Sequence, residues 1–405
     1  MHFYPFSDDR GAVDIPVHVI VHEHLRTAAL CLGVAYGSRD DPATAGGLAH
    51  MLEHVLMSSP RRGTFGVAEQ VEWLGGEANA QTGLETMLFT AHVQEQYLDE
   101  VLGSLTQAVL RPRWDKAYVE QERGAVQQEL AAMQADPSET VQDAFLARLF
   151  GAHPLGRPVG GTLPEVSSMS MEQIASVHET VFLPAPMVLC VVAPRPPEGL
   201  SAGERSLRPR PDNAHLPEPL APRERTGVVW PEEFAWVCVG GRAVPAGHPG
   251  AAAFQVLSTL LGDSPSSLLY QRLRRDGSLA YMFQSWYRGY AEAGAWRTMI
   301  GLEPENGPAA VDVVLGALEE LAGAGPKPEQ LGAAVRKTTT SLLQESEGPL
   351  DLAKLTSSRV IAARGPWSLS GETAALNDVT VDDVRRAAAL VLEAPQIEVR
   401  PAVAE

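Results

Sequence analysis

The segment "AALCLGVAYGSRDDPATAGGLAHMLEHVLMSS", residues 28–59, places a strand-like apolar run before a helical one. The same order recurs in the second half of the chain, where "FAWVCVGGRAVP" precedes "GAAAFQVLSTLLG". The offset between the two copies is 238 − 31 = 207 at their cysteines and 250 − 46 = 204 at the glycines that begin their helical runs. A near-constant offset predicts an internal duplication, and therefore two domains built on one plan.

The first half mixes strand-like and helical periodicities without strict alternation. Apolar runs over 17–24, 29–38, 86–93 and 187–194 predict strands, and helices are predicted over 46–58, 67–74, 94–110, 114–136 and 139–150. We therefore expect an α+β fold of two homologous domains, each a mostly antiparallel sheet packed with helices on one side. The expected domains are residues 1–197 and 227–405, joined by a Pro/Arg-rich linker over 198–226.

Composition and charge narrow the classes of protein that fit. The chain has 405 residues, of which 45% are hydrophobic and 20% charged, as expected of a folded protein with more than one domain. A formal net charge of −18 argues against a nucleic-acid partner, which needs clustered Lys and Arg. No signal-like or membrane-spanning run is seen, so we expect a cytoplasmic protein with no membrane partner. Cys31, Cys190 and Cys238 lie in apolar runs and are expected to be buried and reduced.

The helical run at 46–59 carries three polar residues that an ordinary core helix would not. His50 and His54 are one turn apart on one helical face, and Glu53 lies beside them. The spacing is H-x-x-E-H, the reverse of the H-E-x-x-H zinc helix, and it suits the same chemistry. The alternative is that they are satisfied core polar groups, but three buried polar groups without partners would cost several kcal/mol. The spacing therefore favours a zinc (Zn²⁺) site in which Glu53 is the general base.

The duplication supports a single polar site, because the second copy has Phe254, Leu257 and Ser258 at the equivalent positions. A catalytic zinc ion needs a third protein ligand. The helix expected over 114–136 offers glutamates that are either ligands or part of a solvated face, and residue types alone do not decide between these readings. These glutamates are Glu120, Glu122 and Glu129.

Several motifs together resemble the pitrilysin and mitochondrial processing peptidase family, in its short bacterial form, over nearly the whole chain. Residues 35–57 are similar to that family's strand end and zinc helix, and residues 74–93 to its Asn-Ala-x-Thr strand. Residues 122–129 resemble its second glutamate segment, and 153–166 its His-Pro-x-Gly loop. In the second half, "SSLLYQRLRRDGSLAYMFQSWY" resembles its Leu-Arg … Gly-Leu-Ala-Tyr motif.

The resemblance implies roles for particular residues. The family's third zinc ligand follows the second histidine by about 75 residues, and 129 − 54 = 75 selects Glu129. Glu122 is then the carboxylate that orients a ligand histidine. Arg274 and Tyr281 match the family's substrate-gripping pair, in which Tyr281 also donates to the developing oxyanion.

The resemblance also implies where substrate binds and what the protein does. Asn79 and Ala80 match the edge strand on which an extended peptide lies. We expect a zinc-dependent endopeptidase that cleaves peptides or unfolded segments inside a dimeric clamshell, as a homodimer or as a heterodimer with a related subunit. One alternative is a peptidase dedicated to one precursor peptide together with a partner subunit. The other, from a different class, is a non-catalytic assembly subunit.

Overall fold

The computed structural model describes residues 2–8, 11–60, 65–202, 217–218, 220–223, 227–262, 264–363 and 366–402. Most of the predicted linker, at 203–216, 219 and 224–226, lies outside the described residues. The chain forms two compact units. Unit 1 is Met1–Ala131, Pro158–Asp212 and Gln344–Trp367, and unit 2 is Ala132–Arg157, Asn213–Leu343 and Ser368–Glu405.

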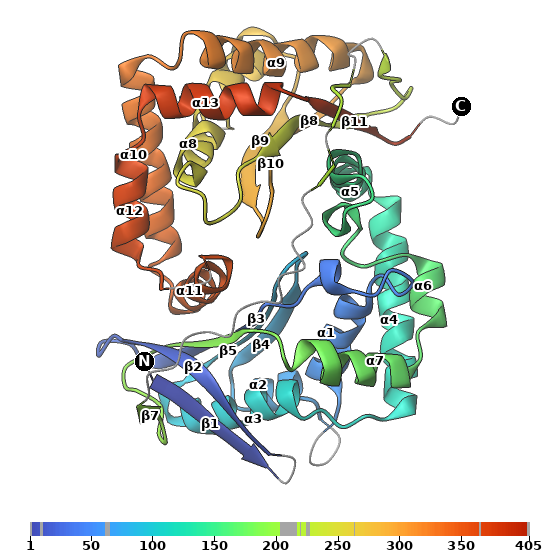
Figure 1. Ribbon diagram of the computed structural model, residues 1–405, viewed down its shortest axis with the longest axis vertical. Coiled ribbons are helices and arrows are strands. Elements are labelled where there is room, and N and C mark those ends of the chain that lie inside the picture. Colours follow the sequence, from blue (N-terminus) through green and yellow to red (C-terminus); the bar gives the residue numbers. More distant parts are fainter. Residues whose placement is uncertain are drawn as a thin grey trace. The chain divides into compact units, whose positions relative to one another are not determined.

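Unit 1 is built on a seven-stranded sheet with the strand order β4-β5-β3-β6-β2-β1-β7 (Figure 1). Only the β2–β6 pair is parallel among the pairs described, so the sheet is mostly antiparallel, as predicted. The strands are β1 (His2–Asp8), β2 (Gly11–Val21), β3 (Thr27–Val34), β4 (Glu77–Thr82), β5 (Met87–Gln94), β6 (Met187–Ala193) and β7 (Ser201–Ala202).

The main core of unit 1 lies between this sheet and its first helices. Helix α3 shows why these segments pack: its buried residues recur every three or four positions and form one apolar face. The helices of the first half in this unit are α1 (Leu48–Ser58), α2 (Val67–Trp73), α3 (Leu98–Leu110), most of α4 (Lys116–Ala135), α6 (Leu163–Ser168) and α7 (Met171–Val177).

A helix from the second half of the chain, α11 (Pro349–Ala363), covers the other face of the same sheet (Figure 1). Its Leu352 and Ala353 pack on Cys31 and Cys190, which are directly opposite each other on β3 and β6. The hydroxyl of Ser357 also donates a 3.1 Å hydrogen bond to the Cys31 carbonyl. The sequence did not predict this additional helix layer. All three cysteines are buried and free, as predicted.

Unit 2 repeats the plan with an antiparallel sheet in the order β11-β8-β10-β9. This order matches β6-β3-β5-β4 strand for strand, which confirms the predicted duplication at the level of topology. Its strands are β8 (Ala235–Ala243), β9 (Met282–Gly289), β10 (Gly294–Leu302) and β11 (Gln396–Arg400). Its helices are α5 (Pro137–Phe150), α8 (Ala251–Leu261), α9 (Gly307–Gly323), most of α10 (Pro328–Glu345), α12 (Leu369–Asn377) and α13 (Val381–Leu392), with the π-helical turn η6 (Tyr270–Asp276).

In unit 2, one face of the sheet is covered by a helix from the first half of the chain and the other face by a helix from the second half. The Arg242 side chain donates to the Leu149 carbonyl of α5, whereas the next residue along β8, Gly241, abuts Val391 of α13. Neighbouring strand residues point to opposite faces, so α5 and α13 lie on opposite sides of the sheet. Helix α5 follows α4 as α11 follows α10. Helix α5 comes from the first half of the chain but belongs to unit 2, and α11 comes from the second half but belongs to unit 1.

Among the described residues, no helix is both long enough and apolar enough to cross a membrane.

Candidate metal centre

Helix α1 begins after the N-cap residue Gly47, which has no side chain to satisfy the first backbone N–H groups. The carboxylate of Asp41 supplies an acceptor instead, at 2.9 Å from the Ala49 nitrogen. The Tyr36 hydroxyl donates to the same oxygen over 3.0 Å, and Asp41 is 4% exposed. Burial raises the pKa of this carboxyl to about 7, although the Tyr36 hydroxyl and the backbone N–H groups of the helix start act to lower it.

Glycine is required where the start of α1 meets a second loop. Gly47 has φ +83°, and a Cβ there would lie 2.2 Å from the Gly160 carbonyl oxygen. Gly161 has φ +68°, and its Cβ would lie 2.2 Å from the Gly46 carbonyl oxygen. Any larger residue at these positions would push the two backbones apart. The close approach fixes the start of α1, whose first turn contains His50.

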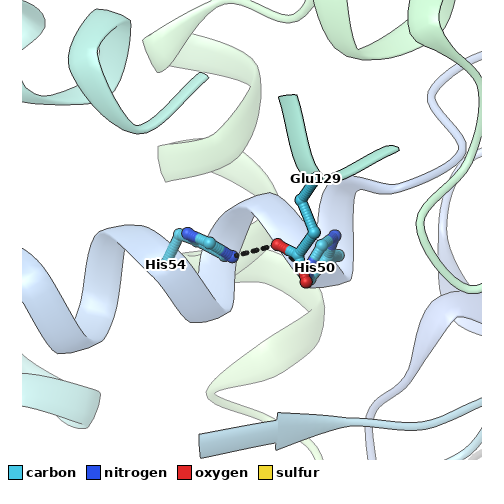
Figure 2. Close-up of side chains that lie close together, drawn as sticks. All are labelled: His50, His54 and Glu129. Carbon is cyan, nitrogen blue, oxygen red and sulfur yellow. Dashed lines mark ion pairs between the residues drawn. The ribbon is translucent and has the colours of Figure 1, made fainter. Parts of the chain in front are cut away.

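Two histidines of α1 and one glutamate of α4 point toward a common centre (Figure 2). The Glu129 Oε2 atom lies 3.6 Å from His50 Nε2 and 3.4 Å from His54 Nε2. One donor atom from each residue falls within 4.8 Å of the others. The side chains of His50 and His54 are 13% and 23% exposed and that of Glu129 is 48% exposed, so the cluster is accessible from one side.

This donor set fits zinc. Two imidazoles and one carboxylate are a ligand set of catalytic zinc sites, which leave a further position open. Burial, and then the neighbouring His54, lower the pKa of His50, which keeps its imidazole neutral and available as a ligand. The separations of 3.6 Å and 3.4 Å between Glu129 Oε2 and the two histidine Nε2 atoms also suit ligand atoms bound to one tetrahedral ion at about 2.0–2.2 Å.

Helix α4 divides its three glutamates between two environments. Glu122 Oε2 lies 3.3 Å from His54 Nδ1, the ring nitrogen that does not face Glu129. This contact is the largest cause that raises the pKa of His54. A carboxylate in this position fixes the ring orientation and the tautomer of a histidine ligand. Glu120, by contrast, is half exposed and pairs with Arg123 on its own helix.

Glu53 sits beside the cluster and is held by a neighbouring strand. The hydroxyl of Thr82, the last residue of β4, donates a hydrogen bond to Glu53 Oε2. Sequence reasoning did not select Thr82 as a site residue. The sequence feature that could have identified it is the threonine that ends the Asn-Ala-x-Thr segment. This threonine is two residues beyond Ala80 and therefore lies on the same face of the strand.

The predicted substrate-binding residues of unit 1 lie on an edge strand. β4 is the terminal strand of the described sheet and pairs with β5 on one side only. Asn79 is exposed, and its carbonyl accepts a 3.0 Å hydrogen bond from the Thr90 hydroxyl. Ala80 alternates with it and faces inward. The outer edge of this strand is the kind of surface to which an extended peptide adds by main-chain hydrogen bonds.

The remaining predicted pair belongs to unit 2. The guanidinium carbon of Arg274 lies 4.2 Å from the ring centroid of Tyr281 and 5.2 Å from that of Tyr270. Tyr281 is 74% exposed, so its hydroxyl is open to solvent. With Met282 and Met299, the pair lines a pocket of about 360 Å³. Within the unit, the structure therefore brings Arg274 and Tyr281 into direct contact at an accessible surface.

Comparisons with known proteins identify the family to which this chain is similar. Residues 18–163 match the family described as insulinase (peptidase family M16), and residues 168–338 match the peptidase M16 inactive domain. An uncharacterized zinc protease of Mycobacterium bovis is 34% identical over 327 residues, which cover 76% of this chain and 73% of the relative. A probable mitochondrial-processing peptidase β subunit of Arabidopsis thaliana is 27% identical over 165 residues, covering 40% of this chain and 31% of that protein.

Solved structures share this fold. A protease from Helicobacter pylori superposes with a TM-score of 0.82 at 19% identity, covering 98% of each chain. That likeness concerns the fold, because the sequences have diverged widely. The "inactive domain" match falls on the half of the chain in which Phe254, Leu257 and Ser258 stand at the positions of the metal-site residues.

Proposed function

Since this chain belongs to peptidase family M16, we propose that it is a zinc-dependent endopeptidase that hydrolyses peptides or unfolded segments. The observation that carries the proposal is the convergence of His50, His54 and Glu129, with Glu53 beside them. In this proposal the first three side chains hold the zinc ion, and Glu53 remains free of it to move protons. Glu122 would orient His54 through its 3.3 Å contact.

When bound, zinc would lower the pKa of a coordinated water and polarise the scissile carbonyl. Glu53 takes the proton from the attacking water as the new carbon–oxygen bond forms. It then delivers that proton to the leaving nitrogen as the peptide bond breaks, so the proton is conserved. Thr82 holds one carboxylate oxygen of Glu53, which leaves the other oxygen for the proton transfer.

Two sets of residues are proposed to bind substrate. An extended peptide adds to the outer edge of β4 at Asn79 and Ala80, where main-chain hydrogen bonds give affinity with modest sequence preference. Tyr281 would donate a hydrogen bond to the oxyanion that develops on the scissile carbonyl, and Arg274 would grip the substrate backbone. Tyr281→Phe should then lower kcat/KM while zinc content stays unchanged. An unaltered kcat/KM would remove Tyr281 from the mechanism.

We also propose that the working form is a dimer, either of two copies or with a related subunit. The sequence carries both the metal-site residues and the Arg274–Tyr281 pair, which supports a homodimer. Light scattering over a range of concentrations should find twice the 43.4 kDa chain mass. A monomer that retains full activity when diluted would contradict the dimeric clamshell.

The two alternative functions can each be tested. A peptidase dedicated to one precursor would cleave few members of a mixed peptide library, whereas a general peptidase would cleave many. A non-catalytic assembly subunit would neither bind zinc nor cleave peptides. The complete His50, His54, Glu129 and Glu53 set supports the catalytic reading over the assembly one.

The direct test of the proposed function is metal-dependent proteolysis. The protein is stripped of metal with a chelator and mixed with a peptide library, and the products are identified by mass spectrometry. Cleavage should disappear in the stripped protein and return when one equivalent of zinc per chain is added. Cleavage that survives complete metal removal would overturn the assignment.

A further inference from the structure

One carboxylate in unit 2 is shared by three arginines. Glu398 on β11 has a side chain that is only 8% exposed. Its Oε1 atom accepts hydrogen bonds from Arg148 on α5 and, at 2.9 Å, from Arg223 Nη1. Its Oε2 atom lies 3.2 Å from Arg400 Nη1. We call Arg148, Arg223, Arg400 and Glu398 the arginine cluster.

The arginine cluster is unbalanced in charge. Three guanidinium groups face one carboxylate, which leaves an excess of two positive charges among these four residues. Burial lowers the pKa of Arg223, and the positive charges of Arg148 and Arg400 lower it further against the opposing effect of Glu398. This local excess occurs in a chain with 50 acidic and 32 basic residues. Like charges held together without enough counter-charge favour the binding of an anion.

The three guanidinium groups also retain unused donors. Arg148 uses only its Nε atom, and Arg223 and Arg400 use only their Nη1 atoms, which also reach the carbonyls of Ile397 and Val399. No described residue accepts a hydrogen bond from the Nη2 atom of any of the three. An arginine guanidinium presents five donors in a planar fork, so most of the donor capacity of the cluster is available to a ligand.

The cluster lines an open groove of about 990 Å³ between α5 and β11. Ala144 and Ala147 form the α5 wall, and their small side chains leave space beside the arginines. Leu220 and Val229 contribute apolar surface on other walls. Among the described lining residues, Glu398 is the only acid. The groove therefore joins a cationic region to an apolar one.

We propose that this groove binds a small phosphate monoester, with its phosphate on Arg148, Arg223 and Arg400 and its organic part against the apolar walls. A phosphate monoester carries close to two negative charges above its second pKa, which matches the excess of two positive charges. Its oxygens accept the paired N–H donors that guanidinium groups offer. A carboxylate carries one charge and two oxygens, so it satisfies the cluster less completely. The site lies apart from the zinc-ligand residues in sequence and does not depend on the proposed peptidase activity.

The probes are inorganic phosphate and phenyl phosphate, with acetate as the carboxylate comparison. Binding to the full-length protein is measured by isothermal titration calorimetry at about pH 8 and constant ionic strength, where phosphate is mainly dianionic. We expect phenyl phosphate to bind at least about tenfold more tightly than acetate, which corresponds to 1.4 kcal/mol or more. We also expect it to bind more tightly than inorganic phosphate, because of the apolar walls.

Matched variants assign the binding to the groove. Arg148→Gln and Arg400→Gln should each weaken phenyl phosphate binding by at least about tenfold, the loss expected for a charged hydrogen-bonding partner. Arg386→Gln is the control, because Arg386 is an exposed α13 arginine that pairs with Asp383 on its own helix. It should bind as the wild type does, and circular dichroism checks that all variants are folded.

Thermal unfolding gives a second readout, because a ligand that binds the folded state raises Tm. Phenyl phosphate should raise Tm in the wild type and in Arg386→Gln, and much less in Arg148→Gln and Arg400→Gln. Three results would overturn the proposal. The first is that neither phosphate probe binds saturably, and the second is that acetate binds as tightly as phenyl phosphate. The third is that all folded variants bind phenyl phosphate equally.

Discussion

The Thr82 hydroxyl at the end of β4 donates a hydrogen bond to the Glu53 carboxylate on α1. This contact joins the edge strand on which substrate is expected to lie to the residue expected to move protons. It also fixes one of the two carboxylate oxygens, so the position of the base depends on the position of the strand.

Replacing Thr82 tests whether this contact matters for catalysis. In Thr82→Val the side chain keeps its shape and loses the donor, so Glu53 is less firmly oriented. We expect kcat to fall about 10- to 100-fold, because a hydrogen bond to a charged group contributes about 1.5–3 kcal/mol. Thr82→Ser should restore most of the rate, and zinc content should be the same in all three proteins. A Thr82→Val enzyme with wild-type kcat would show that Glu53 needs no such support.

The glutamates of α4 offer a matched pair of substitutions. Glu129 lies within 3.6 Å of both histidine Nε2 atoms, whereas Glu120 pairs with Arg123 on the helix surface. Loss of a group that supports a metal ligand from outside weakens metal binding by about 10- to 100-fold. We expect Glu129→Gln to weaken zinc binding by more than this, because Glu129 is proposed to be a ligand itself. Glu120→Gln should bind zinc as the wild type does. Competition with a chromophoric chelator measures both, and equal affinities in the two variants would remove Glu129 from the ligand set.

The raised pKa of Asp41 predicts that the stability of the folded chain depends on pH. Burial raises the pKa of its carboxyl to about 7 in the folded chain, from an ordinary value near 3.8. The folded state therefore binds a proton more tightly than the unfolded state, and the free energy of unfolding falls as pH rises between these two values. A shift of about three pKa units corresponds to roughly 4 kcal/mol.

Asp41→Asn keeps an oxygen acceptor for Ala49 and Tyr36 but does not ionise. In metal-free protein, the wild type should lose stability to urea from about pH 4 to about pH 7 relative to the variant. Asp378→Asn, at an exposed position after α12, is the control and should follow the wild type. Parallel stability profiles for wild type and Asp41→Asn would contradict the raised pKa.

The sequence was informative where chemistry depends on local spacing. His50, Glu53 and His54 share one helical face because the helix repeat requires it, and the structure forms that helix over Leu48–Ser58. The choice of Glu129 over Glu120 needed the family resemblance, since glutamates on a long helix also occur on solvated faces. The structure places Glu129 beside both histidines, and its role as a zinc ligand stays a prediction.

Other features depend on tertiary contacts that spacing does not encode. The apolar face of an amphipathic helix shows that the helix packs but does not identify the sheet it covers. The sequence therefore gave no sign that α11 joins unit 1 or that α5 joins unit 2. Asp41 was missed because the backbone N–H groups it accepts are brought to it only when the loop before α1 folds. The arginine cluster was missed because Arg148, Arg223 and Arg400 are far apart in the chain.

In the proposed zinc peptidase, Glu53 is the base. The most direct measurement compares wild type with Glu53→Gln for zinc stoichiometry by atomic absorption and for peptide cleavage by mass spectrometry. We predict one zinc per chain in both proteins and a loss of about 10²- to 10⁴-fold in cleavage for Glu53→Gln, the usual contribution of a general base. Undiminished cleavage by a Glu53→Gln protein that still holds zinc would contradict the account.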